Sequence, residues 1–366
     1  MRYSISVIGA GTSGLIAARR LGELGFASTV YDQKTVLGVP VRASGILSIA
    51  GMQGLGMDYA GCVTNTLYGA NIHAGGRTMR IESKEPVARV LDRKRLNEVC
   101  HDDAVRSGAR VLTRRRITGG ELDSMAKKGT VIGADGAVSS VAKHFGFGEI
   151  GKFALTYKAE FEVESAESGM VDLFFDSNEY RGLFAWMCPN RKDLLEVGLG
   201  LYSGAGNAKM AFDRFIRKSP VADLIAGRRP VSEGASIIPM AMRRSIVDEK
   251  RRVVLVGDAA GQVKPTTGGG IIFGGNGALL AAKAIANNLT VGSALSDYET
   301  EFRKAYGLDL RLHSVINHIY SRTGPSSMGR MISAMNALGV DRFLSTYGDM
   351  DRPTLVLKRF FFRSLA

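Results

Sequence analysis

A glycine-rich turn close to the N-terminus constrains the fold more than any other feature. The stretch GAGTSG places Gly9, Gly11 and Gly14 in GxGxxG spacing between an apolar strand and a segment with helical periodicity. Asp32 ends a second strand, where a carboxylate can accept hydrogen bonds from ribose hydroxyls. The expected helix N-terminus offers N–H groups to phosphates. This order predicts a dinucleotide-binding βαβ unit; a purely structural glycine-rich turn is the alternative.

Two later segments favour FAD over NAD as the dinucleotide. GTVIGADG is a strand that runs into Asp135, which as a single residue reads as the cap of a turn. VVLVGDAAGQVKPTTGGGI is a buried strand that ends at Asp258, from where a carboxylate can reach a sugar or ribityl hydroxyl. The glycines at 268–270 lead into a helix whose N-terminus can stabilise an anionic reduced flavin. An NAD dehydrogenase has no evident need for this second element.

The order of patterns along the chain predicts the fold class. It runs from α/β to β-rich, returns to α/β, and ends helical, so the first domain is expected to be discontinuous. The apolar segment 268–286 contains Asn276 and Lys283, and we expect a buried helix there, not a membrane span. We predict a Rossmann-like FAD-binding domain at 1–66, 92–150 and 240–290, an inserted antiparallel-sheet substrate domain at 67–91 and 151–239, and a helical C-terminal region at 291–366.

Composition narrows the function classes. Hydrophobic residues make up 45% of 366 residues, as in a globular protein, and the net charge of +13 favours anionic partners such as lipid headgroups or an acidic redox protein. No nucleic-acid-binding motif is present, so no nucleic-acid partner is expected. Cys62, Cys100 and Cys188 lack CxxC spacing, which argues against a disulfide framework, a metal site and a built-in iron–sulfur cluster. The sequence enters a strand at once, so no signal peptide is expected and the predicted location is cytoplasmic.

The flavin motifs together resemble a known group of enzymes. GxGxxG, Asp32, GADG and GDAAG…P…GGGI look like the FAD-dependent group typified by aromatic hydroxylases. Within that group the chain most resembles the geranylgeranyl reductase family, especially archaeal members that act on digeranylgeranylglycerophospholipids. The resemblance covers residues 1 to about 320 and implies an aromatic-hydroxylase-like fold with bound FAD.

The resemblance also implies which residues contact FAD. They comprise the phosphate turn, the ribose acid, the loop near the isoalloxazine ring, the arginine that heads the next helix, an adenine-side contact, and the acid and helix start of the second motif: Gly9, Gly11, Ser13, Gly14, Asp32, Arg42, Ala43, Gly45, Arg93, Ile117, Asp258, Gly270 and Ile271. For the two arginines, a surface or phosphate-neutralising role is the alternative.

Two further positions bear on this site. Many relatives have a cysteine in the loop that here reads Arg-Ala-Ser-Gly and is one residue shorter, so a mechanism that needs a thiol at Ser44 is not supported. Lys264, beside Pro265, is expected to be a solvated loop lysine; a position near the flavin edge is the alternative.

The segment FAWMCPNRKDLLEVGLG matches a substrate-pocket signature of the same family. The signature is an aromatic residue, any residue, Trp, any residue, Phe, Pro, then seven or eight residues and Gly-x-Gly. Its positions here are Phe184, Trp186, Cys188, Pro189, Gly198 and Gly200, with Phe for the usual Tyr and Cys for the usual Phe. The segment by itself indicates a buried hairpin; beside the flavin motifs it predicts the wall of a lipid pocket.

The resemblance implies an enzyme that saturates isolated double bonds of geranylgeranyl chains in archaeal-type membrane lipid precursors. A hydride from reduced flavin reaches one alkene carbon and a proton reaches the other. No catalytic residue is identified; water, Tyr202 and the flavin itself remain open as the proton source. The implied partners are a prenylated lipid, an external reductant such as NADPH or reduced ferredoxin, and an anionic membrane surface. The C-terminal LVLKRFFFRSLA is either an interfacial helix or a packed terminal helix.

Two other functions share the flavin motifs. One is an FAD-dependent monooxygenase that acts on an aromatic or prenyl compound, whose product gains oxygen. The other is an electron-transfer flavoprotein that passes electrons to a quinone.

Overall fold

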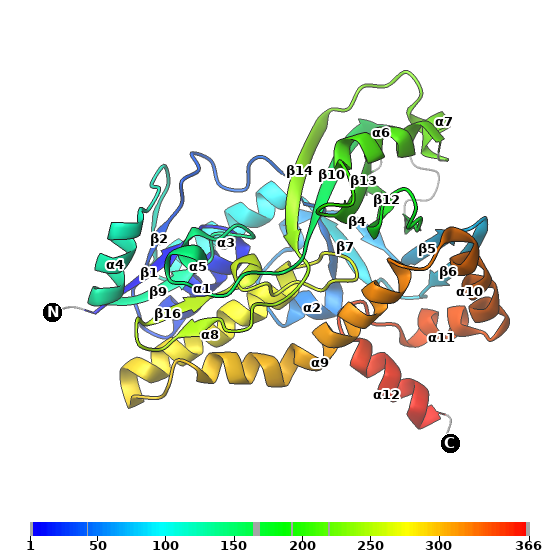
Figure 1. The fold of residues 1–366 in the computed structure, drawn as a ribbon. Coiled ribbons are helices and arrows are strands. Elements are labelled where there is room, and N and C mark those ends of the chain that lie inside the picture. Colours follow the sequence, from blue (N-terminus) through cyan, green and yellow to red (C-terminus); the bar gives the residue numbers. More distant parts are fainter. Residues whose placement is uncertain (1–2, 42, 164–168, 192, 219, 364–366) are drawn as a thin grey trace.

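The computed structural model describes residues 3–41, 43–163, 169–191, 193–218 and 220–363. The described strands form three sheets, of six, seven and three strands. The six-stranded sheet with its helices makes one half of the molecule and the seven-stranded sheet makes the other (Figure 1). The long helix α9 (Asp297–Tyr320) contacts α8 in the first half and β12 in the second, so it spans both halves.

The six-stranded sheet holds the N-terminal βαβ unit. Its order is β15-β16-β9-β1-β2-β8, and all neighbours are parallel except the edge pair β15 and β16. Strands of a parallel sheet are covered on both faces, which explains their continuous apolar runs. The strands are β1 (Ser4–Ile8), β2 (Thr29–Tyr31), β8 (Arg110–Leu112), β9 (Gly129–Gly133), β15 (Val247–Asp248) and β16 (Val253–Leu255).

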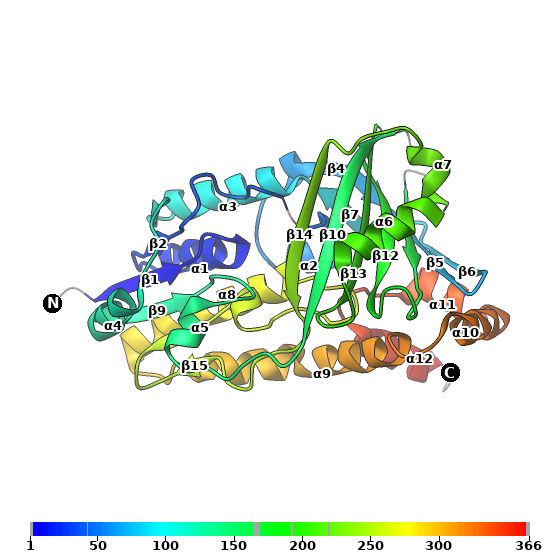
Figure 2. The same cartoon turned by 45° about the horizontal axis from the view of Figure 1, so that its top comes forward.

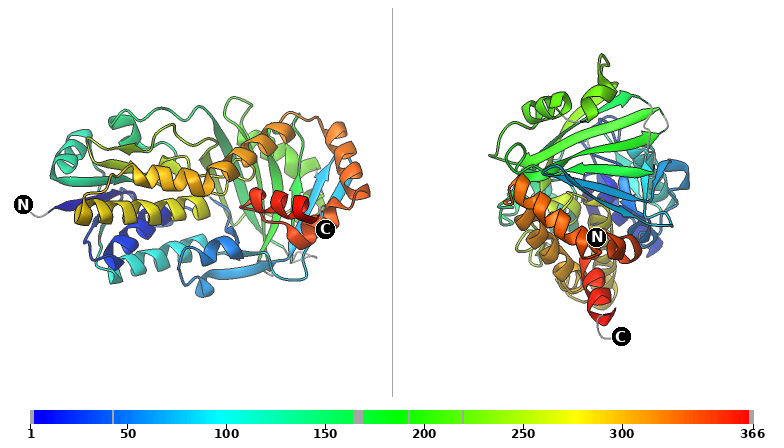
Figure 3. Two further views of the ribbon diagram at one scale, coloured as in Figure 1. Left: turned by 90° about the horizontal axis from the view of Figure 1, so that it is seen from below. Right: turned by 90° about the vertical axis from the view of Figure 1, so that its right-hand side faces the viewer.

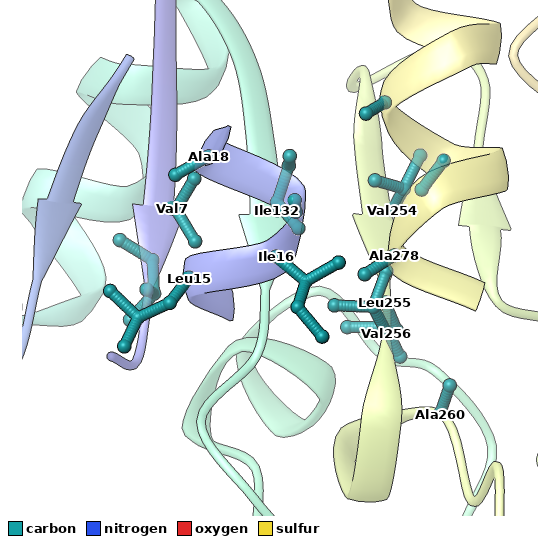
Figure 4. Packing of buried hydrophobic residues seen from close by; sticks show 14 of the residues in the cluster. Val7, Leu15, Ile16, Ala18, Ile132, Val254, Leu255, Val256, Ala260 and Ala278 are labelled. Atoms are coloured by element: carbon teal, nitrogen blue, oxygen red, sulfur yellow. The ribbon is translucent and has the colours of Figure 1, made fainter. Parts of the chain in front are cut away.

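Helices cover this sheet. Helix α1 packs against α3 and α8, and α4 packs against β9 and β1. Figure 4 shows Val7 of β1 near Leu15 of α1, and Val254 of β16 on the other side of Ile16, beside α8, all within one buried core. The helices of this half are α1 (Thr12–Glu23), α3 (Arg93–Arg106), α4 (Gly119–Lys128), α5 (Ser140–His144) and α8 (Ile271–Val291), with the 3-10 helix η2 (Gly257–Ala259).

The seven-stranded sheet has the order β14-β10-β13-β12-β11-β5-β6, and only β11 and β5 run parallel. Alternate residues of β13 point to opposite faces. Leu195, Val197 and Leu199 pack with α6, which lies against β10 and β13 (Figure 2), so Glu196 and Gly198 belong to the other face. The elements are β5 (Gly69–Ala74), β6 (Arg77–Glu82), β10 (Phe153–Glu162), β11 (Met170–Phe174), β12 (Gly182–Arg191), β13 (Leu194–Tyr202), β14 (Ser232–Pro239), α6 (Ala208–Lys218) and α7 (Val221–Ile225).

The remaining elements include a small sheet and the C-terminal helices. A small sheet, β3-β7-β4, follows the flavin-side loop, and helices α10 and α11 pack on β6. Helix α12 packs on α9, as Figure 3 shows at the C-terminal end of the chain. These elements are β3 (Ile46–Ser48), α2 (Ile49–Gln53), η1 (Ala60–Cys62), β4 (Val63–Leu67), β7 (Ala88–Leu91), α10 (Pro325–Ala337), α11 (Val340–Tyr347) and α12 (Pro353–Arg363).

The structure confirms the predicted fold class. The six-stranded sheet takes strands from all three pieces predicted for the FAD-binding domain. The exact domain boundaries stay a prediction. The predicted boundary after residue 66 falls inside β4, which belongs to the small three-stranded sheet that the sequence did not predict. The apolar segment at 268–286 forms the buried helix α8, as expected. Among the helices that the structure describes, none is long and apolar enough to cross a membrane.

Candidate FAD and substrate site

The glycine turn between β1 and α1 forms as its spacing predicts. Gly9 has a φ of +106°, and a Cβ there would lie 2.3 Å from the Ala134 carbonyl oxygen, so only glycine fits this turn. A Cβ on Gly14 would lie 2.0 Å from the Gly9 oxygen, so α1 packs directly on the turn. At Gly11, the N-cap of α1, a Cβ would meet nothing within 4 Å. The open side of the turn is therefore free to receive a phosphate at the helix N-terminus.

A smaller cavity of about 330 Å³ lies beside the second strand. Gly9, Gly11, Asp32 and Ile117 line it together with Arg115 and Arg116. The Asp32 carboxylate accepts the N–H groups of Ala10 and Lys34, each at 2.8 Å, and this fixes its orientation at the strand end. Asp135 caps the next helix, accepting the Ser140 N–H at 2.7 Å, as expected from its position. The cavity suits the adenosine part of a dinucleotide.

A larger cavity of about 390 Å³ continues from the turn toward the seven-stranded sheet. It brings together predicted cofactor residues and predicted substrate residues that are far apart in the sequence. From the flavin motifs they are Gly11, Ser13, Ala43, Arg93, Asp258, Gly270 and Ile271, and from the substrate signature they are Phe184 and Trp186. The predicted cofactor and substrate parts of the site therefore lie along one continuous cavity.

Two residues of opposite charge, Asp258 and Arg93, line this cavity, and each affects the pKa of the other. Burial raises the pKa of Asp258 to about 6, against the opposing effect of the Arg93 cation. Burial likewise lowers the pKa of Arg93. The Arg93 Nη1 atom is buried and has no hydrogen-bond partner within the described part of the chain. A buried donor without a partner is costly, so this atom fits a ligand that accepts hydrogen bonds.

These residues fit FAD. The open turn at Gly11, the unpartnered Arg93 donor and the Asp258 carboxylate lie in one cavity, whose floor is the N-terminus of α8 at Gly270 and Ile271. Phosphates, hydroxyls and a flat ring are the groups that such a set would bind.

The loop beside this region is described only in part. Arg42 lies outside the described residues. Ala43 and Ser44 line the larger cavity, whereas Gly45 packs beneath them against β7, where a Cβ would lie 2.0 Å from the Leu91 oxygen. Ser44 donates its hydroxyl hydrogen to Glu196 on β13. The loop is thus held to the substrate sheet by a side chain that the sequence did not single out.

The substrate signature divides into wall and support. Phe184 and Trp186 line the cavity. A Cβ on Gly198 would lie 2.0 Å from the Trp186 ring, and one on Gly200 would lie 2.6 Å from Leu183. The two glycines therefore make room for the wall residues but do not line the cavity themselves. Cys188 and Pro189 do not line the cavity either. Cys188 is buried behind the wall, among apolar residues of β4, β7 and β11.

Lys264 was expected to be solvated, and that expectation is wrong. Its side chain is 4% exposed and forms an ion pair with Asp351, which also accepts the Ser48 hydroxyl. His313 contacts the Asp351 backbone oxygen at 3.0 Å. Burial raises the pKa of Asp351, but Lys264 and the hydrogen bonds outweigh burial and hold that pKa below its usual range. Asp351 lies 87 residues beyond Lys264, and no local signal points to the pair.

Sequence reasoning also missed Glu196 and Lys158, although a signal existed. Each charge interrupts an otherwise largely apolar strand, LLEVGLGLY or FALTYKAEFE, and buried charges occur in pairs. Tyr202, one of the open proton sources, is not part of the cavity lining and donates its hydroxyl to Asn317.

Comparison with known proteins agrees with this geometry. Residues 2–307 match the family described as FAD binding domain. A digeranylgeranylglycerophospholipid reductase from Methanothrix thermoacetophila is 27% identical over 385 residues, covering 93% of each chain.

Solved structures share the fold. A geranylgeranyl bacteriochlorophyll reductase-like protein from Thermoplasma acidophilum superimposes with a TM-score of 0.82 at 18% identity, covering 97% of this chain and 95% of its own. A probable FAD-dependent monooxygenase from Pseudomonas aeruginosa gives 0.69 at 15% identity, covering 91% and 99%. With the match over residues 2–307 and a cavity that fits the cofactor, the chain belongs to the FAD-binding-domain family and is an FAD-dependent oxidoreductase.

Proposed function

We propose that this protein saturates isolated double bonds of geranylgeranyl chains in archaeal-type membrane phospholipid precursors. The observation that carries the proposal is the continuous cavity that runs from the FAD residues to the wall at Phe184 and Trp186. Apolar side chains from three strands extend that wall, among them Val171, Leu173 and Ile238. Such a lining suits a hydrocarbon chain better than a polar aromatic acid. The name of the Methanothrix relative supports the same substrate class.

Reduced FAD, when bound, supplies the hydride for one carbon of the double bond. The chain's own part is to bind the prenyl segment beside the cofactor and to exclude water with the apolar wall. The ring faces of Phe184 and Trp186, whose centroids are 6.3 Å apart, are suited to tolerate cationic character at an alkene that has no carbonyl to polarise. We assign no side chain as the proton donor.

We further propose an anionic membrane surface and an acidic electron donor such as ferredoxin as partners; NADPH is the other candidate reductant. The net charge of +13 supports both partners, because it attracts anionic surfaces. Helix α12 exposes Leu357 and Phe360 beside Lys358 and Arg359, a combination suited to a lipid interface.

Mass spectrometry tests the reaction. Lipids are extracted from cells that make geranylgeranyl phospholipids, with and without this protein and with an active donor system. We expect mass gains in steps of two hydrogens only when the protein is present. Lipids that stay unchanged while the bound FAD is demonstrably reduced contradict the proposal. A product that gains oxygen indicates a monooxygenase, and reoxidation by a quinone alone indicates an electron-transfer flavoprotein.

A further inference from the structure

A buried carboxylate lies behind the lining of the larger cavity and is hydrogen-bonded to two residues that line it, Ser44 and Trp186. Glu196 on β13 is 4% exposed. Its Oε1 accepts the Trp186 indole N–H at 2.8 Å and the Ser44 hydroxyl. Its Oε2 accepts the Lys158 ammonium at 2.6 Å. Three donors from three separate segments, the loop at 43–45, β10 and β12, therefore meet at one side chain.

Burying the charges of Glu196 and Lys158 has a large cost in desolvation free energy, which calls for a reason. Burying a carboxylate and an ammonium together removes both from water, and the Coulomb attraction offsets this only when the remaining hydrogen bonds are made. An apolar pair at these two positions would serve the sheet equally well. The charges do one thing that apolar side chains cannot, because they hold an indole N–H and a loop hydroxyl in fixed directions.

The geometry of Trp186 depends on this carboxylate. Gly198 lies directly beneath the indole ring and leaves it room to lie against the sheet, but a glycine does not select how the ring is turned. The hydrogen bond to Glu196 does, because the indole has a single N–H donor. An anionic acceptor on that N–H also raises the electron density of the ring, which strengthens its attraction for positive charge.

We propose that Glu196 is a positioning residue that ties the loop beside the flavin, through Ser44, to the indole of Trp186 in the substrate wall. The proposal rests on the proposed function for its catalytic consequence. It predicts that a change at Ser44 reaches Trp186 through Glu196 Oε1, the acceptor that the two residues share. The two sides of the cavity are then set together and not independently.

The fluorescence of Trp186 provides a direct test, because the chain contains one tryptophan. Emission spectra and iodide quenching are recorded on FAD-loaded protein without lipid for wild type, S44A, E196Q and S44A/E196Q. We expect S44A and E196Q each to shift the emission maximum, and S44A to have no further effect in the E196Q background. Equal S44A shifts in both backgrounds, or no shift for either single variant, overturn the proposal.

Two controls keep this test decisive. E233Q makes the same chemical change on β14, which lies beyond β10 in the same sheet. Glu233 accepts the Tyr157 hydroxyl on the side of the sheet that faces α6, so this variant should leave Trp186 emission unchanged. In E196Q, Lys158 keeps a second acidic partner, because its Nζ also lies 3.6 Å from Glu160 Oε1. Should E196Q still not fold, E196Q/K158M removes both charges of the closer pair and replaces it in the cycle.

Turnover adds an independent readout. With a geranylgeranyl lipid and reduced FAD, E196Q should lower kcat about tenfold and change KM less than about twofold. The kcat should fall because the variant leaves the Trp186 ring unoriented and lowers its electron density. The KM should change little because the wall remains apolar. Unchanged kcat with a shifted Trp186 emission overturns the catalytic consequence. If wild type reduces no prenyl lipid at all, the proposed reaction fails, while the fluorescence cycle still decides whether Glu196 couples the two sides.

Discussion

At the scale of single residues, the site depends on charged groups held in a partly enclosed cavity. Asp258 and Arg93 both line the larger cavity. Burial raises the pKa of Asp258 and lowers the pKa of Arg93, so it favours the neutral form of each group. Such groups are destabilising without a ligand and are suited to bind one, so functional sites concentrate them.

Asp258 should make the FAD-free protein less stable as pH rises. Its carboxyl has an ordinary pKa of 3.8 and a folded pKa of about 6, so the folded state holds the proton more tightly. The stability that this group contributes is present below pH 3.8 and is lost as pH rises through 6, by at most about 3 kcal/mol. Urea unfolding between pH 4 and 7 should show this fall in wild type relative to D258N. Parallel curves for the two proteins would show that the burial does not matter.

Trp186→Ala should impair turnover of long prenyl lipids while leaving FAD bound. The ring lines the cavity at the proposed substrate wall, and the residues predicted to hold FAD are others. We expect kcat/KM to fall at least about tenfold, equivalent to ~1.4 kcal/mol, with an unchanged ratio of FAD to protein by absorbance. W186F, which keeps a ring but has no N–H, should lie between the two. Loss of FAD from W186A would instead give the ring a structural role.

At the scale of elements, the segment between α11 and α12 closes the cavity. Met350 and Asp351 line it, and Asp351 holds Lys264 in the loop that leads into α8. The segment that joins the C-terminal helices α11 and α12 is thus part of the cavity lining.

Replacing only one member of the Lys264–Asp351 ion pair should lower the unfolding free energy more than replacing both members. D351L leaves the Lys264 ammonium buried without its partner, and we expect a loss of about 3–5 kcal/mol of unfolding free energy. K264M/D351L removes both charges and should recover most of that loss. Denaturant unfolding of both variants and wild type measures the difference. A double variant no more stable than D351L contradicts this interpretation.

At the scale of the whole molecule, the net charge should govern attachment to lipid. Binding to vesicles that contain anionic phospholipid should weaken as salt screens the charges. K358Q/R359Q on α12 should weaken binding by about 2 kcal/mol, since each basic residue at a membrane contributes about 1 kcal/mol. K127Q/K128Q on α4 removes the same charge from another surface and serves as the control. Equal effects of the two pairs would rule out α12 as the contact.

Local patterns in the sequence predicted the fold and part of the site. The glycine turn, Asp258 and the start of α8 each follow from a short motif whose geometry is set by neighbouring residues. Glu196 and Asp351 could not be paired in advance with Ser44 and Lys264, because strand order and the return of the C-terminal segment bring them together. Lys264 was misjudged for the same reason: burial of a lysine depends on a distant partner.

The cavity takes one wall from Gly11 and another from Asp351, and Asp351 is synthesised long after Gly11. A nascent chain that has left the ribosome only as far as α8 already has the phosphate turn but leaves Lys264 unpaired and one side of the cavity open. We expect such a chain to lose FAD readily and to retain it only after α12 has emerged. Retained yellow colour would then mark completed chains, and a cell that degrades colourless protein would remove unfinished copies.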